Sequence, residues 1–309
     1  IKGMSINDVQ TPCLVIDYLA FTENIKKMKI FCKKNKVLLR PHAKMHKSID
    51  IAKHQLKFGG AHGICCQKVS EAEVFAKSGI KDILITNQIC DPLKIERLTN
   101  ISLLGCRIAC CVDNLQNVQD IQASAESKDA FVDIYVEFDC GAKRCGLTSV
   151  EEINDIISMI TNSKNLKFKG LQAYNGSNQH IIDNKLRLKA VTKTNSSIKR
   201  LVNQLNIKKC IISGGGTGCF EDEVNDDIYD EIQVGSYAFM DAHYSKLIKN
   251  KNKNLFFKNS LFILTTVMSN NKENFAVVDA GLKSQSVDSG LPLVFNNLEL
   301  NYVKCSDEH

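Results

Sequence analysis

The fold is decided by residues 61–86, AHGICCQKVSEAEVFAKSGIKDILIT. A short apolar run at each end flanks a segment with helical spacing at 70–78. Ser70 stands three residues before Glu73, and in this Ser-x-x-Glu spacing the two side chains satisfy free amides at a helix start. A strand, a helix and a second strand in this order are typical of a parallel βαβ unit.

The same alternation continues on both sides of this unit, and eight strand-like runs can be counted. They are residues 37–40, 61–66, 82–86, 106–112, 131–138, 168–174, 210–213 and 231–234. Helices are predicted over 70–78, 92–100, 114–126, 149–161 and 183–205, and Ser149 with Glu152 repeats the cap spacing. Eight parallel strands with helical crossovers close into a (β/α)8 TIM barrel, which we expect over residues 17–245.

After residue 246 the pattern changes to strands without helices, at 261–268, 274–279, 292–295 and 298–304. We expect a second, β-rich domain there, made of residues 246–309 together with 1–16. The early segment Thr11-Pro12-Cys13-Leu14-Val15-Ile16-Asp17 could cross between the two domains, and the sequence pattern leaves that open.

Composition limits the class of protein. With 309 residues and 44% hydrophobic content, the chain can bury the cores of both domains. No apolar run reaches the roughly 18 residues of a membrane span and the first residues lack a signal-peptide core, so we expect a cytoplasmic protein without a membrane partner. The net charge of +6 comes from dispersed lysines, so we expect no nucleic acid partner. The thirteen cysteines are interpreted as small hydrophobic residues, because many lie in apolar runs.

The first strand run is followed by the octet Arg40-Pro41-His42-Ala43-Lys44-Met45-His46-Lys47. A lysine at the end of a buried strand has a lowered pKa, because water no longer solvates its ammonium, and the free amine can attack a carbonyl. Lys44 is therefore the candidate Schiff-base nucleophile, which suggests carbonyl or pyridoxal phosphate chemistry. His42 and His46 have the spacing of a metal pair, but the proline and the strand end favour packing or hydrogen bonding beside a cofactor.

Two glycine-rich segments follow the last two strands of the expected barrel, where barrels commonly bind a phosphate. Glycine lets backbone amides approach an anion closely, and hydroxyl groups add donors. The segments are Ser213-Gly214-Gly215-Gly216-Thr217-Gly218 and Gly235-Ser236-Tyr237. In a closed barrel the eighth strand lies beside the first, so we expect this phosphate site to be a neighbour of Lys44.

Three further side chains are expected at the same end of the barrel. Arg144 lies in Asp139-Cys140-Gly141-Ala142-Lys143-Arg144-Cys145-Gly146, whose glycines suggest a tight turn after the fifth strand. Its guanidinium could hold the phenolate oxygen of pyridoxal phosphate, or could lie in an exposed loop. Gln67 ends the second strand and Tyr174 ends the sixth, so both are cofactor-binding candidates that could equally be core-edge residues.

Over essentially its whole length the chain resembles fold-type III pyridoxal phosphate enzymes with an alanine racemase-like barrel, and within them the D-threonine aldolase and D-serine dehydratase group. The motifs that carry the resemblance are Thr11-Pro12-Cys13-Leu14, residues 41–47, 139–146 and 213–218, Gln172-Ala173-Tyr174, and Gly235-Ser236-Tyr237-Ala238-Phe239-Met240-Asp241. Three further stretches, 63–73, 278–290 and 304–309, look most like the 3-hydroxy-D-aspartate aldolases.

The resemblance implies retro-aldol cleavage of a small D-configured β-hydroxy amino acid, dependent on pyridoxal phosphate and a divalent metal (Mg, Mn or Zn). The expected reaction converts 3-hydroxy-D-aspartate to glycine and glyoxylate. Lys44 would be the Schiff-base lysine, with His42 and Arg144 as further catalytic residues, in a homodimer. The alternatives are D-threonine aldolase activity, dehydration of D-serine or 3-hydroxyaspartate, and a non-catalytic pyridoxal phosphate carrier; known single-barrel carriers lack the extra β domain.

The chain departs from the family at Asn175 and His243, where relatives more often carry a larger polar residue and an acid. The family's metal ligands, a His-x-Asp or His-x-Cys pair, follow the Ser306-Asp307-Glu308-His309 motif, so we expect them beyond residue 309 and none within this chain. Because residue 1 is also not methionine, we expect a fragment whose C-terminal domain is incomplete.

Overall fold

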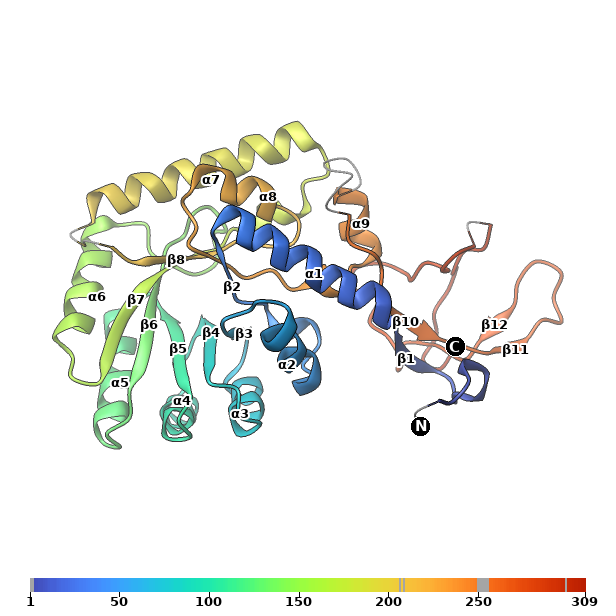
Figure 1. Cartoon of the computed structure of the whole chain (residues 1–309), viewed down its shortest axis with the longest axis horizontal. Coiled ribbons are helices and arrows are strands. Elements are labelled where there is room, and N and C mark those ends of the chain that lie inside the picture. The colour runs from blue at the N-terminus through green and yellow to red at the C-terminus, as the bar shows by residue number, and fades with distance from the viewer. Residues whose placement is uncertain (1–2, 206, 208, 249–255, 298) are drawn as a thin grey trace.

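A computed structural model describes residues 3–205, 207, 209–248, 256–297 and 299–309 (Figure 1). Eight strands form one parallel sheet in the order β2-β9-β8-β7-β6-β5-β4-β3. The sheet closes because β2 also meets β3, through parallel bridges at Leu39–Ala61 and His42–Cys65. All eight expected barrel strands are present, and the predicted (β/α)8 barrel is confirmed.

The barrel strands are β2 (Leu38–Leu39), β3 (Ile64–Cys66), β4 (Asp82–Gln88), β5 (Arg107–Val112), β6 (Val132–Glu137), β7 (Leu166–Ala173), β8 (Ile211–Gly214) and β9 (Glu231–Ile232). The α-helices are α1 (Tyr18–Asn35), α2 (Ile49–Phe58), α3 (Val69–Lys77), α4 (Pro92–Leu103), α5 (Leu115–Glu126), α6 (Val150–Asn162), α7 (Asn184–Gln204), α8 (Phe220–Glu223) and α9 (Ala242–Ile248). The short 3-10 helices are η1 (Ile6–Asp8), η2 (Ala43–Met45), η3 (Gly176–His180), η4 (Val224–Asp226) and η5 (Ser236–Ala238). The helices that follow the strands lie outside the sheet (Figure 1), and the five predicted helices correspond to α3 through α7.

Helix α6 shows how the sequence specifies these crossovers. The Ser149 hydroxyl accepts a hydrogen bond from the Glu152 amide at 3.2 Å, which confirms the predicted cap. Isoleucines then recur every three or four residues and are buried, at Ile153, Ile156, Ile157 and Ile160. Each buried isoleucine contributes about 1.5 to 3 kcal/mol, so the apolar stripe holds the helix on the sheet.

The predicted cap of α3 is wrong. The helix begins at Val69, its N-cap is Lys68, and no side chain caps it. Ser70 is therefore already inside the helix. The carboxylate of Glu71 accepts a hydrogen bond from the Gln67 amide at 2.9 Å, so an acid in the first turn binds the residue that precedes the N-cap.

The neighbouring residues Cys65 and Cys66 pack into two different hydrophobic cores. Cys65 packs inside the barrel with Leu84, Ala109, Cys111 and Tyr135, whereas Cys66 packs between the sheet and the helices. Successive strand residues point to opposite faces, which explains this division. Burial raises the pKa of both thiols well above the usual range, and all thirteen cysteines are free. Eight of the cysteines are buried, as expected of small hydrophobic residues, whereas Cys90 is exposed.

Four further strands lie beside the barrel, at the right of Figure 1: β1 (Cys13–Ile16), β10 (Leu261–Leu264), β11 (Val267–Ser269) and β12 (Val277–Val278). β1 pairs with β10 in antiparallel register, so the early segment joins the C-terminal strands. β11 pairs with β12. The single run expected at 261–268 is thus divided into two strands with different partners.

Two predicted strands are wrong within the described residues. Over 292–295 and 299–304 only an isolated antiparallel bridge forms, between Leu293 and Asn301, and Leu298 lies outside the described residues. Apolar residues there suggested strands, but a strand needs a partner with which to form a hydrogen-bonded ladder. The domain division at residues 245 and 246 stays a prediction. No helix in the described part of the chain combines the length and apolar character required to cross a membrane.

Candidate active site

The turn that carries Lys44 follows β2 directly. The strand ends at Leu39, and the His42 Nδ1 atom accepts a hydrogen bond from the Lys44 amide at 3.4 Å, which caps η2. The His42 Nε2 atom therefore carries the ring proton and donates to the Thr86 hydroxyl at 3.0 Å. Burial, followed by the charge of Lys44, lowers the pKa of His42 well below its usual range, so the ring stays neutral.

Lys44 is exposed where it borders an open cavity, but the surrounding barrel wall still removes water from around it. This desolvation is the largest cause that lowers the pKa of the Lys44 ammonium, and the positive charge of Arg144 is the second. A lysine with a lowered pKa supplies more neutral amine at neutral pH. That is the state in which an amine attacks a carbonyl carbon.

The loop after β8 brings backbone close to this amine. Gly215 has φ of +74°, in the left-handed region that favours glycine. A Cβ atom at Gly216 would lie 2.5 Å from the Gln179 Oε1 atom, so a larger residue would displace the loop. The Thr217 hydroxyl accepts a hydrogen bond from the Tyr237 amide at 3.3 Å, which leaves its own proton available to the cavity.

The other residues predicted for this loop have different surroundings. Ser213 is fully buried, and its hydroxyl donates to the Glu231 carboxylate and accepts from the Gln233 Nε2 atom at 2.7 Å. Its proton is therefore already used. Gly214 belongs to β8, and like Ser213 and Gly215 it does not line the cavity. Cofactor binding by these three residues stays a prediction.

The segment after β9, which pairs with β8, forms the adjoining part of the cavity wall. A Cβ atom at Gly235 would lie 3.1 Å from the His42 carbonyl oxygen, so glycine permits the close approach of the two turns. Ser236 lines the cavity beside it. Tyr237 is fully buried, and its hydroxyl accepts a hydrogen bond from the Gln55 Nε2 atom at 3.1 Å. The Tyr237 side chain thus belongs to the core, and only its amide reaches the site, through Thr217.

Arg144 lies on a loop that side chains hold in place. The Asp139 carboxylate accepts hydrogen bonds from two loop amides at 3.0 Å each, and the Asp113 carboxylate accepts from the Gly146 amide at 2.9 Å. Among the described residues Arg144 forms no ion pair. The Arg144 residue is exposed where it lines the cavity, and a guanidinium without an ion-pair partner is suited to bind an anion.

These elements enclose a cavity of about 260 Å³ at the carboxyl ends of the barrel strands, which we call the mouth. The predicted residues that line it are His42, Lys44, Gln67, Arg144, Tyr174, Gly216, Thr217, Gly235 and Ser236. Sequence reasoning missed Met45, Thr86, Gln172, Gln233 and Tyr244, which also line it. Thr86 is the last residue of a predicted strand, so the rule that barrel sites form at strand ends could have found it.

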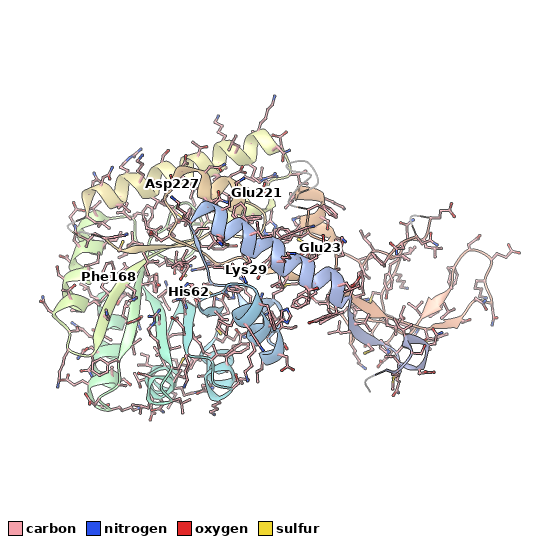
Figure 2. The ribbon with its side chains drawn as sticks, in the orientation of Figure 1. Glu23, Lys29, His62, Phe168, Glu221 and Asp227 are labelled. Carbon is pink, nitrogen blue, oxygen red and sulfur yellow. The ribbon has the colours of Figure 1, made fainter. Side chains whose placement is uncertain are left out.

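The opposite end of the barrel holds a network of paired charges, which we call the floor: Arg40, His62, Asp82, Arg107 and Glu231. Figure 2 labels His62 beside the barrel strands. The Glu231 Oε2 atom accepts from Arg40 Nε at 2.8 Å and from His62 Nε2 at 2.6 Å. Arg40 also donates to Asp82 at 2.5 Å, and Asp82 pairs with Arg107. Burial favours a higher pKa for Glu231, but the His62 hydrogen bond and the Arg40 charge outweigh it and hold the pKa at about 2.

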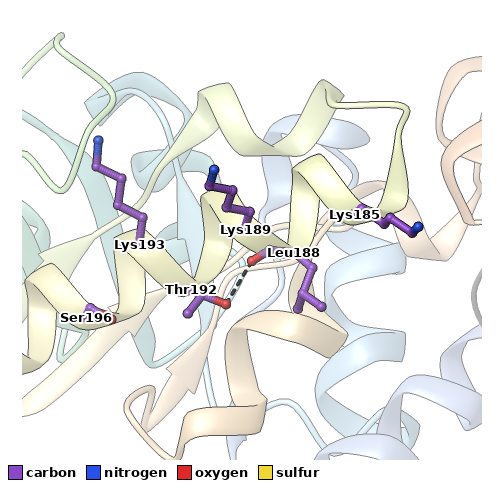
Figure 3. Close-up of a pocket in the computed structure, with 6 residues that line it drawn as sticks. All are labelled: Lys185, Leu188, Lys189, Thr192, Lys193 and Ser196. Carbon is purple, nitrogen blue, oxygen red and sulfur yellow. Dashed lines mark hydrogen bonds between the residues drawn. The ribbon is translucent and has the colours of Figure 1, made fainter.

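A second, shallow depression lies on the outer side of α7 and shares no residue with the mouth. It is lined by Lys185, Leu188, Lys189, Thr192, Lys193 and Ser196 (Figure 3). All of these residues are exposed. Lysines at helical spacing on an exposed face are typical of a solvated surface, so this depression is not the candidate site.

No three His, Cys, Asp or Glu side chains come together as metal ligands in the described part of the chain. His42 and His46 have separate partners. The His46 Nδ1 atom accepts from the Ser48 amide at 2.9 Å, and its Nε2 atom lies 3.3 Å from the Gln55 Oε1 atom. The two histidines therefore hold the turn around Lys44 and do not share a ligand position.

Comparison with known proteins agrees with this geometry. Residues 16–243 match the alanine racemase N-terminal domain, and residues 260–309 match a putative serine dehydratase domain. The chain is 46% identical to 3-hydroxy-D-aspartate aldolase of Paracoccus denitrificans (strain Pd 1222), over 100% of this chain and 81% of that protein. It is 38% identical to D-threonine aldolase of Arthrobacter sp, over 99% of this chain and 81% of that protein.

A solved structure also shows similarity to an aldolase. The crystal structure of D-threonine aldolase from Filomicrobium marinum superimposes with a TM-score of 0.93 at 35% identity, covering 98% of this chain and 82% of that one. Both the barrel and the adjoining strands fall within the matched range. With the fold, the mouth and these similarities together, the chain belongs to the fold-type III pyridoxal phosphate enzymes, in the alanine racemase-like group that contains these aldolases.

Proposed function

We propose that this protein is an aldehyde-lyase that cleaves D-configured β-hydroxy-α-amino acids, with 3-hydroxy-D-aspartate as substrate and glycine and glyoxylate as products. The observation that carries the proposal is the Lys44 amine, which has a lowered pKa and lies in the same cavity as the Thr217 hydroxyl, a hydrogen-bond donor for a phosphate. The similarity to a 3-hydroxy-D-aspartate aldolase over the whole chain supports the choice of substrate.

The residues of the mouth fit pyridoxal phosphate. Lys44 offers an amine to its aldehyde, and the Thr217 hydroxyl has its acceptor side occupied by an amide, so it can donate to a phosphate. Gly216 and Gly235 allow close approach of backbone where a Cβ atom would meet its neighbours. Arg144 supplies a cation for the phenolate oxygen.

When bound, pyridoxal phosphate supplies an electron sink for the electron pair that is released when the Cα–Cβ bond breaks. The residues of the mouth would hold the cofactor. Lys44 Nζ would bind it covalently and exchange a proton with the reacting amino acid, which its lowered pKa permits. His42 stays neutral and orients the Lys44 turn through its Nδ1 atom. Burial raises the pKa of Tyr174 to about 12, so its hydroxyl keeps its proton at the mouth.

The described residues bring no three His, Cys, Asp or Glu side chains together as a metal site. The requirement for Mg, Mn or Zn stays a prediction from the family resemblance, with ligands expected beyond residue 309. The homodimer and the cytoplasmic location are likewise predictions.

Dehydration is the second candidate function, because residues 260–309 match a putative serine dehydratase domain. The two reactions differ in which bond breaks at the substrate. An aldolase breaks Cα–Cβ and releases glycine with an aldehyde or glyoxylate, whereas a dehydratase loses the β-hydroxyl group and releases ammonia with a 2-oxo acid.

A product assay separates the two. The protein, loaded with pyridoxal phosphate and a divalent metal, is incubated with D-3-hydroxyaspartate, D-threonine or D-serine, and glycine, glyoxylate, acetaldehyde and ammonia are quantified. We expect glycine and glyoxylate in equal amounts from D-3-hydroxyaspartate, with slower turnover of D-threonine. Ammonia as the main product would replace the aldolase proposal with the dehydratase.

A further inference from the structure

A buried carboxyl group and a buried amide hold the glycine-rich loop from behind. The Gly216 amide donates to Glu223 Oε2 at 3.0 Å, and the Gly218 amide donates to Gln179 Oε1 at 2.9 Å. The Gln179 Nε2 atom donates to Glu223 Oε1 at 3.1 Å, which joins the two supports. Glu223 and Gln179 are both almost completely buried. The shape of the loop therefore depends on this pair, which comes from α8 and η3.

These hydrogen bonds also decide which donors face the cavity. The amides of Gly216 and Gly218 are used by side chains behind the loop, so they are not free to bind a ligand. Thr217, between them, lines the cavity and has a hydroxyl proton to donate. Glu223 and Gln179 thus hold the loop so that Thr217 faces the mouth.

In the described part of the chain no cation balances the Glu223 carboxyl. The titratable groups that interact with it electrostatically from the surrounding elements are Cys140, Tyr174, Tyr229 and Tyr244, and the acids Glu221 and Asp222 share its helix. Among the described residues Glu223 forms no ion pair. Burial raises the pKa of Glu223 to about 8, although hydrogen bonds from Gly216 and Gln179 favour the charged form. Burial thus favours the protonated form of this carboxyl group.

We propose that Glu223 and Gln179 are positioning residues for a phosphate monoester: they fix the loop at residues 216–218, and the proton on Glu223 controls how strongly the loop binds a dianion. This inference rests on the proposed function, because pyridoxal phosphate is the monoester expected at the mouth. A neutral Glu223 supports the loop without repelling the ligand. When pH rises through the pKa of Glu223, a negative charge forms behind the loop and phosphate affinity falls.

The test measures binding of phenyl phosphate to the full chain without cofactor, by calorimetry at pH 7.0 and 9.5. This ester is a dianion over the whole range, because the second pKa of a phosphate monoester lies near about 6. We expect the wild-type affinity to fall about tenfold more than that of Glu223→Gln between the two pH values. Lys44 also loses protons in this range, but it does so in both proteins, so the difference reports Glu223.

Asp227→Asn is the matched control. It removes one negative charge close to Glu223 in sequence, from an exposed residue that Figure 2 labels, and asparagine tolerates its left-handed backbone. We expect this variant to keep the wild-type pH dependence. Equal pH dependence in the wild type and Glu223→Gln would overturn the inference and leave the proposed function standing. Failure of every variant to bind phenyl phosphate at pH 7.0 would overturn both.

A second measurement does not need a change at Glu223. With Lys44→Ala as the background, phenyl phosphate is titrated at pH 8.5 in two buffers of different ionisation enthalpy, and the number of protons taken up is calculated. We expect uptake of a fraction of a proton per ligand, because the bound dianion favours protonated Glu223. No proton uptake would contradict the inference even if Glu223→Gln does not fold.

Discussion

The two ends of the barrel differ in whether their positive charges are paired with carboxylates. At the floor, Arg40 is buried against Glu231 and Asp82, and Asp82 also pairs with Arg107. At the mouth, neither Lys44 nor Arg144 forms an ion pair among the described residues, and the charge of one lowers the pKa of the other. Arg40 of the floor and Lys44 of the mouth both follow β2, whereas Arg144 follows β6.

The difference separates what stabilises the barrel from what performs chemistry. The charges at the floor form ion pairs with one another, so they are not available to bind a ligand. Unpaired cations at the mouth cost stability but attract an anion and keep an amine reactive. Barrel enzymes place their reactions at the carboxyl ends of strands, and the charges of this chain follow that rule.

The largest effect is expected at the mouth, from Lys44→Ala. Without the amine no cofactor can be trapped by borohydride, and turnover should fall by at least about a thousandfold. The melting temperature should stay near that of the wild type, because the Lys44 side chain forms no ion pair with any residue that the structure describes. Lys47→Ala, at an exposed neighbour outside the cavity, is the control and should keep the trapped cofactor. Unchanged visible absorbance of bound cofactor in Lys44→Ala would show that the lysine is misassigned.

At the floor, Glu231→Gln should act on stability instead. Loss of the buried charge leaves Arg40 and His62 with a weaker partner, which should lower the free energy of unfolding by about 3 to 5 kcal/mol. Urea denaturation measures the change. Glu23→Gln removes a carboxylate from the exposed face of α1 (Figure 2) and should have a much smaller effect. Equal effects from the two variants would mean that the floor network does not stabilise the barrel.

The floor should also make stability depend on acid pH. The pKa of Glu231 is lowered from 4.5 to about 2 in the folded chain, so its contribution is complete above pH 4.5 and is lost as pH falls toward 2. The shift corresponds to about 3 kcal/mol. Stability curves of the wild type and Glu231→Gln should therefore converge as pH falls through this window. Parallel curves would rule out Glu231 as the titrating group.

The smallest effects come from a pair of arginines, one at each end. Arg144→Met removes the unpaired cation of the mouth and should weaken binding of pyridoxal phosphate about ten- to a hundredfold, because a charge-assisted hydrogen bond is lost. Arg107→Met removes a paired, half-exposed cation of the floor and should leave cofactor affinity unchanged. Fluorescence titration with the cofactor measures both. A larger loss of affinity from Arg107→Met would reverse the roles assigned to the two ends.

The barrel could be predicted from sequence because its signals are local. Each strand run is short and apolar, each helix has its own spacing, and the closure of eight such units follows from a general rule. The same rule placed Lys44 beside the glycine-rich loop. The strands predicted at 292–295 and 298–304 failed because strand formation depends on a partner elsewhere in the chain, which a local pattern does not reveal.

Within the site, the sequence predicted the reactive groups better than the residues that hold them in place. Lys44, Arg144 and Thr217 line the mouth, as expected, whereas Ser213 and Tyr237 are buried in hydrogen-bonded cores. Glu223 was missed because the run Glu221-Asp222-Glu223 resembles a solvated acidic turn. Only the packing of α8 behind the loop shows that its last acid is buried.

The central claim is that Lys44 is the one lysine that binds the cofactor. It is tested most directly by incubating the protein with pyridoxal phosphate, reducing it with borohydride and locating the modified lysine by peptide mass spectrometry. We predict a pyridoxyl phosphate group on Lys44, one per chain, and none on Lys47 or Lys68. A label on another lysine, or no label, would contradict the account.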